Sequence, residues 1–214
     1  MRKEMPDGKH VEVATSGIRD NYLRGAVGDF LLQKIRDGSD LSVVSAYFTI
    51  YAFGALQKRL VEIDRMRFLF GEPRFLQSLD PERTDKKAFK IEDEGLQLAN
   101  RLQQKRLARE CADWITGKAE IRSVRETALM HGKMYHLSYN GIDDAILGSS
   151  NFTLHGLGLG SANNNIELNL EVDSNRDRRD LKAWFEEIWN NLELVEDVKP
   201  EVLRYLQQRA QRHQ

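Results

Sequence analysis

Two residues near the middle of the chain have the side chains and the spacing of a phosphoryl-transfer catalyst. His131 and Lys133 are two positions apart in the stretch LMHGKMYHLSYN. Residues i and i+2 of a β-strand point to the same face, so we expect an imidazole and an ammonium group to project side by side. An imidazole can act as nucleophile or transfer a proton, and an ammonium group can hold phosphate oxygens. The pair therefore predicts chemistry at a phosphorus centre.

A second group of polar residues follows within twenty positions. Ser149 and Asn151 lie in the sequence Gly-Ser-Ser-Asn at the end of a predicted strand, and both can donate hydrogen bonds to an oxyanion. The dipeptide Asn140-Gly141 between the two strands is a strong hairpin signal, which predicts that both groups meet at one edge of a sheet. Further on, Asn165 and Glu167 are expected on one face of a last strand.

These motifs resemble those of the phospholipase D superfamily, whose signature is His-x-Lys followed by Gly-Ser-x-Asn. The matching residues are His131-Gly132-Lys133, Gly148-Ser149-Ser150-Asn151 and, for a common additional Asn-x-Glu motif, Asn165-Ile166-Glu167. Upstream, SVVSAYFTIYAFGAL and DRMRFLFGEP look like the opening strands of phospholipase D-like domains attached to bacterial helicases and restriction systems. The family usually has Asp five residues after the Lys, where this chain has Ser138.

The resemblance implies a metal-independent phosphodiesterase that needs no cofactor, most simply a nuclease that cleaves DNA through a phosphohistidine intermediate. It implies catalytic roles for five residues: His131, Lys133, Ser149, Asn151 and Glu167. We expect Ser150, Asn165 and His155 to contact the substrate. In the family, two His-x-Lys motifs form one active site. This chain has one, so a two-fold homodimer is expected to supply the second.

The main alternative is a module without catalytic activity that binds nucleic-acid phosphates or dimerises a larger protein. Ser138 in place of Asp favours this alternative, whereas the intact His131, Lys133, Asn151 and Glu167 favour the enzyme. In either case a helicase or ATPase domain in the same native protein is a plausible partner. A lipid-cleaving enzyme is disfavoured, because the chain has no amphipathic or membrane element that suits a lipid substrate.

Composition limits the remaining possibilities. The chain has 32 Lys and Arg against 33 Asp and Glu, a net charge of −1, so any contact with DNA has to come from a local basic patch. The single cysteine, Cys111, excludes a disulfide within the chain and is expected in the core. The polar N-terminus is not a secretory signal, and no apolar run is long enough to span a membrane, which predicts a cytoplasmic protein.

The order of the predicted elements indicates an α/β fold, a mixed β-sheet flanked by helices on both faces, as in the α-β-α sandwich of the phospholipase D family. The predicted strands are 41–48, 66–71, 119–125, 129–138, 143–149 and 166–173. The predicted helices are 18–35, 51–63, 93–116, one from about 175 to 192, and one that starts near Pro200. We expect a flexible arm over 1–16, the phospholipase D-like domain over 17–195, and a C-terminal helix over 196–214 that could connect to a following domain.

Overall fold

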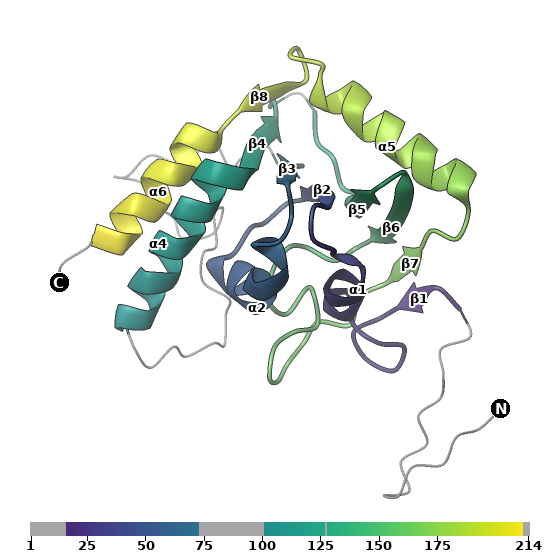
Figure 1. The fold of residues 1–214 in the computed structure, drawn as a ribbon, viewed down its shortest axis with the longest axis horizontal. Helices are drawn as coiled ribbons and strands as arrows, with labels where there is room; N and C mark the ends of the chain where they lie inside the picture. Colours follow the sequence, from purple (N-terminus) through teal and green to yellow (C-terminus); the bar gives the residue numbers. More distant parts are fainter. Residues whose placement is uncertain (1–15, 73–100, 127, 212–214) are drawn as a thin grey trace, which may run out of the picture.

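The computed structural model describes residues 16–72, 101–126 and 128–211, and within them eight strands form one mixed β-sheet (Figure 1). The strand order is β1-β7-β6-β5-β2-β3-β4-β8. The strands are β1 (Ile18–Arg19), β2 (Asp40–Ser45), β3 (Arg65–Phe70), β4 (Ala119–Val124), β5 (Lys133–Tyr139), β6 (Ile142–Gly148), β7 (Asn169–Glu171) and β8 (Val195–Asp197). β2, β3 and β4 are parallel neighbours, and the other pairs are antiparallel.

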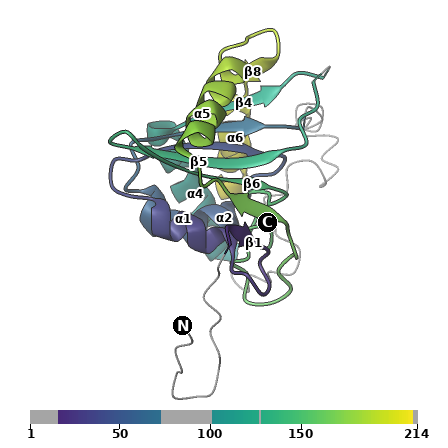
Figure 2. The ribbon, with the colours of Figure 1, turned by 90° about the vertical axis from the view of Figure 1, so that its right-hand side faces the viewer.

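Helices cover both faces of the sheet (Figure 2). α1 (Val27–Lys34), α2 (Ile50–Leu60), α4 (Arg101–Lys118) and α6 (Lys199–Gln211) lie on one face, and α5 (Asn175–Trp189) lies on the other. Alternate residues of the central strands enter two separate apolar clusters: Val43 packs in the larger one, under the four helices, and Val44 in the smaller one, under α5. The predicted mixed sheet with helices on both faces is therefore confirmed.

β2, α2 and β3 form a parallel β-α-β crossover, in the order strand, helix, strand that the sequence predicts. The side chain of Thr49 caps α2 by accepting a hydrogen bond from the main-chain N–H of Ala52 at 3.2 Å. The crossover brings the carboxyl ends of β2 and β3 to the same edge of the sheet, where the N–H of Gly71 donates to the carbonyl of Ser45 at 3.0 Å.

The predicted hairpin is also present and joins β5 to β6. Asn140 and Gly141 both have positive φ, 46° and 75°, which is the conformation that a two-residue hairpin turn requires. The strand before it is shorter than predicted, since β5 begins at Lys133 and leaves His131 outside the sheet. The reason is that the partner strand β2 ends at Ser45, and the next N–H, that of Ala46, bonds to the side chain of Asn151.

The N-terminal part of the domain differs most from the prediction. Residues 18–35 were expected to be one helix, but residues 18 and 19 form β1, and α1 starts only at Val27. Between them the carboxylate of Asp20 accepts the N–H groups of Tyr22 and Arg24, both at 2.8 Å. Side-chain acceptors of this kind satisfy local N–H groups in a turn and compete with a helix. The positive φ of Gly25, 90°, completes the break.

Smaller differences occur elsewhere. The predicted strand over 166–173 is reduced to β7, and the short strand β8 beside β4 was not predicted. The region 196–214, expected as a connector, contributes β8 residues and α6, whose Val202 and Leu206 are buried in the larger cluster. The predicted arm over 1–16 lies, except for Ser16, outside the described residues, as does the start of the predicted helix over 93–116.

Candidate active site at one edge of the sheet

The topology brings the two polar groups of the sequence to the same edge of the sheet. β5 runs antiparallel to both of its neighbours, β2 and β6. Its first residue, Lys133, therefore lies at the edge where β2 and β6 end, and it pairs directly with Gly148. Gly148 is followed by Ser149, Ser150 and Asn151. The residues just before Lys133 and those just after Gly148 thus leave the sheet at neighbouring points.

His131 and Lys133 are close, although not in the way that strand alternation predicts. His131 is exposed and precedes the strand, and Lys133 is half-buried at its first position. The ammonium group of Lys133 donates a hydrogen bond to the main-chain carbonyl of His131 at 2.6 Å. A second bond, from the N–H of Met130 to the carbonyl of Gly71 at 3.0 Å, ties this segment to the end of β3. These bonds hold the His131 segment at the edge without a strand.

Asn151 is fixed by the end of β2. Its side-chain oxygen accepts hydrogen bonds from the hydroxyl of Ser45 at 3.1 Å and from the N–H of Ala46 at 2.9 Å. The same hydroxyl accepts the N–H of Phe152 at 2.9 Å, so Ser45 holds both the side chain and the following backbone. With the amide oxygen occupied, the NH₂ end of Asn151 is directed away from these donors. It is a hydrogen-bond donor of defined orientation, as an anion site requires.

Ser149, Glu167 and Asn165 are linked by hydrogen bonds. The hydroxyl of Ser149 donates to the carboxylate of Glu167 and accepts the N–H of Leu168, the latter at 3.0 Å. The side-chain NH₂ of Asn165 donates to the other oxygen of Glu167 at 3.1 Å. Asn165 and Glu167 were predicted on a strand, but β7 begins only at Asn169. The two side chains nevertheless lie together, because the hydrogen bond between them joins them directly.

Ser150 is placed differently from its neighbours. It is fully buried, and its hydroxyl accepts a hydrogen bond from the side chain of Asn169 at 2.9 Å. Its carbonyl accepts the phenol of Tyr135 at 2.9 Å. Burial raises the pKa of Tyr135, and the negative charge of Glu167 raises it further, so this phenol remains a donor. These bonds hold the backbone between Ser149 and Asn151. Asn169 is a supporting residue that sequence reasoning missed, because it has no motif partner.

The Gly-rich loop after Asn151 places His155 next to Asn165. The carbonyl of His155 accepts the N–H of Asn165 at 3.1 Å. Both ring nitrogens of His155 are buried, and neither has a hydrogen-bond partner among the described residues. Asn164 closes the loop by bonding to the N–H and the carbonyl of Gly160, at 2.8 and 3.0 Å. The predicted substrate contact by His155 would therefore require its ring to leave this position.

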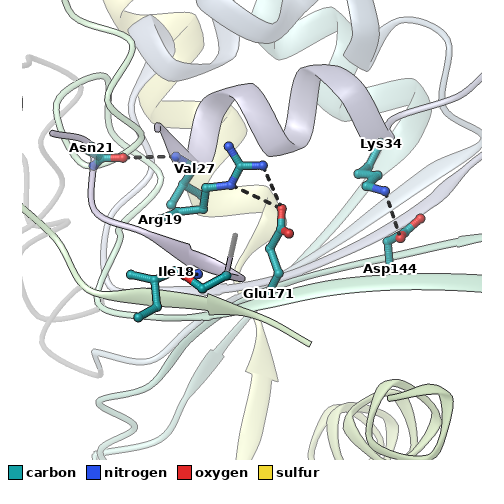
Figure 3. A network of polar contacts seen from close by, with 8 residues as sticks. Ile18, Arg19, Asn21, Val27, Lys34, Asp144 and Glu171 are labelled. Carbon is teal, nitrogen blue, oxygen red and sulfur yellow. Dashed lines mark hydrogen bonds and ion pairs between the residues drawn. The ribbon is translucent and has the colours of Figure 1, made fainter. Parts of the chain in front are cut away.

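The N-terminal segment supports the same loop, which the sequence did not indicate; Figure 3 shows part of this segment, with the Asn21–Val27 bond and the Arg19–Glu171 pair. Asn21 accepts the N–H of Val27 at 3.0 Å and donates to the carbonyl of Gly156 at 2.8 Å, so one side chain joins the start of α1 to the Gly-rich loop. The carbonyl of Asp20 accepts the N–H of Glu167 at 3.0 Å. Beside it, Arg19 and Glu171 form an ion pair between β1 and β7 at 3.1 Å.

Ser138, which stands where the resembled family has Asp, lies at the other end of β5. It is five residues from Lys133, about 17 Å along a strand, and its hydroxyl donates to the carboxylate of Asp143 at 2.6 Å. Asp143 is its direct cross-strand partner, although it does not align with the motif in the sequence. A carboxylate is therefore present at this end of the hairpin, and the change to Ser138 leaves the surroundings of Lys133 unaltered.

Two further observations concern the described residues as a whole. Among residues 16–72, 101–126 and 128–211, no three side chains of His, Cys, Asp or Glu are grouped so that they could hold a metal ion. Within these same ranges, none of the helices combines the length and the apolar character that crossing a membrane requires.

Comparison with known proteins gives one family match. The sequence profile of the family described as the NgoFVII restriction endonuclease N-terminal PLD domain matches residues 91–200, which include all eight site residues that the sequence predicts, from His131 to Glu167. No curated protein matches the chain. Among solved structures, a polyphosphate kinase from Porphyromonas gingivalis aligns with a TM-score of 0.49 and 7% identity. The alignment covers 86% of this chain and 26% of the kinase, so the chain spans about a quarter of that protein.

Proposed function

Because the chain belongs to the family of NgoFVII restriction endonuclease N-terminal phospholipase D domains, we propose that it is a nuclease that cleaves phosphodiester bonds of DNA without a metal ion. The observation that supports this proposal most directly is the convergence of three chain segments at one edge of the sheet. They carry His131 and Lys133, Ser149 and Asn151, and Asn165 and Glu167. The family match and the geometry are independent of each other, and both favour a phosphate-directed site.

The proposed chemistry assigns one role to each side chain. The His131 imidazole attacks phosphorus, forming a nitrogen–phosphorus bond as the bond to the leaving ester oxygen breaks. Lys133 gives up its bond to the His131 carbonyl and binds a phosphate oxygen, and the NH₂ of Asn151 binds another. Ser149 and Glu167 hold each other at the rim. Water then hydrolyses the phosphohistidine and restores the imidazole.

The three predicted substrate-binding residues have different proposed roles. Asn165 is exposed beside Glu167 and is proposed to contact the DNA backbone directly. Ser150 is buried, so we propose that it acts by holding Ser149 and Asn151 in place. His155 is proposed to reach the substrate only after its loop moves, since its ring nitrogens are buried.

We further propose that the active form is a homodimer with two copies of His131 in one site. An in-line displacement needs a nucleophile and, on the opposite side of phosphorus, an acid for the leaving oxygen. Exposed apolar side chains in the two segments that meet at Glu167 support a partner there, because large apolar side chains in contact with water are characteristic of interfaces. Ile166 precedes Glu167, and Tyr22 and Leu23 follow Asp20, whose carbonyl accepts the N–H of Glu167; all three are between 68% and 76% exposed. The Gly-rich loop over 154–163 is expected to line the same interface.

The alternative of a non-catalytic phosphate-binding module loses its main support. It was favoured by Ser138, and that residue lies at the far end of β5 from Lys133. A helicase or ATPase domain in the native protein remains a prediction from the resemblance alone.

A cleavage assay on plasmid DNA tests the proposed function. In EDTA the wild-type chain should nick or cut the plasmid, and Asn151→Ala should cleave roughly a hundredfold more slowly, as is typical for the loss of one oxyanion donor. Activity that disappears in EDTA and returns with Mg²⁺ would contradict the phosphohistidine mechanism. A chain that binds DNA and never cleaves it would revive the alternative.

The dimer has its own test. Ile166→Asp should convert a sedimenting dimer to monomers and reduce cleavage, because a charge in an apolar interface is costly. Val61→Asp is the matched control, since Val61 is also an exposed apolar residue but follows α2 at the opposite edge of the sheet. Mixing wild-type and His131→Ala chains should give heterodimers of strongly reduced activity. Full activity from a protein that sediments as a monomer would refute the shared site.

A further inference from the structure

The two faces of the sheet are covered unequally in the part of the chain that the structure describes. Four helices pack on one face, whereas α5 is the helix that lies on the other (Figure 2). Beside α5, the strands β6 and β7 expose a cross-strand pair of leucines, Leu147 and Leu170, at 39% and 52%. Trp184 of α5 is 37% exposed next to them. A sheet needs its apolar face covered, so this face has room for a further element.

These side chains line a groove of about 580 Å³ between α5 and the sheet. Its apolar surface consists of Val44, Met134, Leu147, Leu170, Val172, Leu181 and Trp184. The outer strands stand about 4.8 Å apart, so three of them provide a surface roughly as wide as an α-helix with its side chains, about 10 Å. A helix packed beside α5 would therefore match the width of this exposed part of the sheet.

The charges on the rim of the groove are mostly negative. Asp173, Asp177 and Asp180 line it, whereas the carboxylate of Glu171, the other acidic lining residue, is paired with Arg19. Asp177 and Asp180 are three positions apart on α5 and lie on one side of the helix, and Asp173 lies two residues before its start. Asp177 also pairs with the exposed Arg176 at 3.0 Å, but none of the arginines of α5 is among the lining residues. The one lining cation is Lys133, whose ammonium group bonds to the carbonyl of His131. The groove is thus an apolar floor with an acidic border.

We propose that this groove binds a basic amphipathic helix of a partner polypeptide, with apolar residues on the leucines and Lys or Arg residues facing Asp177 and Asp180. Charge complementarity selects this partner over a second copy of the chain. In an isologous interface the same surfaces face each other, so two acidic borders would meet and repel. Gly132 and Lys133 line one end of the groove, so a bound helix would touch the segment that carries His131.

A binding measurement on the full chain tests the proposal without reference to cleavage. The probe is a synthetic helical peptide of Leu and Lys with the leucines on one face, and the control peptide replaces each Lys by Glu. The reporter is Leu170→Cys, whose labelling by a maleimide should slow when the Leu/Lys peptide is added. The natural Cys111 is fully buried and should not react in the folded chain.

The charge dependence makes the test specific. Asp177→Lys combined with Asp180→Lys, placed in the Leu170→Cys background, should weaken the Leu/Lys peptide by about tenfold or more, which corresponds to about 1.4 kcal/mol. The double substitution should also allow the Leu/Glu peptide to bind in the groove. Asp113→Lys on the exposed side of α4 is the matched control and should change the binding of neither peptide.

Three results would overturn the proposal. Equal binding of both peptides would mean that the groove binds apolar helices without regard to their charge. Protection of Leu170→Cys in the free chain at all concentrations would mean that the chain itself covers the groove. Protection that increases with protein concentration would identify a second copy as the occupant.

Discussion

The two ends of β5 carry similar residues in opposite environments. At the start of the strand, His131 is exposed, Lys133 is half-buried, and Ser149, Asn165 and Glu167 bond to one another in reach of solvent. Toward the hairpin, His136 is 2% exposed, and its Nε2 donates to the carbonyl of Arg178 in α5 at 3.0 Å. The polar groups at the start of β5 are accessible to solvent, whereas His136 is buried under α5.

The buried end is a row of polar side chains that cross the sheet under α5. Arg67 is buried, bonds to the hydroxyl of Ser42 and the carboxylate of Glu186, both at 3.3 Å, and lies over the ring of Phe185 at 5.2 Å. Ser42 is the cross-strand neighbour of His136. Buried polar groups that are bonded in this way support a fold. The difference teaches that a histidine on a strand is informative about chemistry only when its neighbours remain open to a ligand.

The largest expected effect separates the two histidines by activity. His131→Ala should lower the rate of DNA cleavage by roughly a thousandfold or more, since removal of a nucleophile removes the reaction path. Its free energy of unfolding should stay near that of the wild type, because the side chain is exposed. Cleavage kinetics and urea unfolding on the same samples provide the check. Retention of cleavage by this variant would remove His131 from the mechanism.

The next effect is on stability at the buried end. Arg67→Ala should reduce the free energy of unfolding by about 2–4 kcal/mol. The substitution removes the packing of the buried aliphatic part of the side chain, two hydrogen bonds and the contact with Phe185. Arg65→Ala, two residues earlier on β3, is the control. Its ion pair with Asp40 is about half exposed on both sides and should be worth less than about 1 kcal/mol. Equal losses for the two variants in urea unfolding would contradict the distinction.

A pH dependence of the stability should come from His136. Burial lowers the pKa of His136, as do Lys182 and Arg67, against the opposing effects of Asp143 and the Arg178 carbonyl. The folded state therefore binds a proton less readily than the unfolded state. Its stabilising contribution is complete above the unfolded pKa of about 6.5 and is lost as the pH falls through that value toward the lower folded pKa.

Unfolding free energies at a series of pH values, for wild type and His136→Leu, measure this dependence. The wild type should lose more stability than the variant between neutral pH and pH 5, whatever the stability of the variant itself. A variant with the same slope as the wild type would show that other groups dominate this pH range.

The smallest effects concern the hairpin end of the motif. Ser138→Ala should cost about 1 kcal/mol of unfolding free energy through the lost bond to Asp143, with cleavage unchanged. Ser138→Asp, which restores the residue of the family, should destabilise as well, because it places a second carboxylate directly opposite Asp143. Improved cleavage by Ser138→Asp would show that the two ends of β5 are coupled after all.

Local sequence was sufficient for the parts of this protein that depend on periodicity and turn chemistry. The five longer strands, the Asn140-Gly141 hairpin and the β2–α2–β3 crossover were predicted, because alternation of apolar residues and the conformational preferences of Asn and Gly act over a few neighbouring positions. The hairpin also sufficed to predict that Lys133 and Gly148 lie together at one edge, since its register follows from the turn.

Tertiary contacts decided the rest. Whether His131 lies in a strand depends on where its partner β2 ends, and β2 ends where Asn151, more than a hundred residues later, binds Ser45 and Ala46. The break before α1 depends partly on Asn21 reaching Gly156. The carboxylate that faces Ser138 comes from the neighbouring strand, where no spacing rule for a single segment would find it. Each of these contacts joins residues whose proximity is created only when the whole sheet has formed.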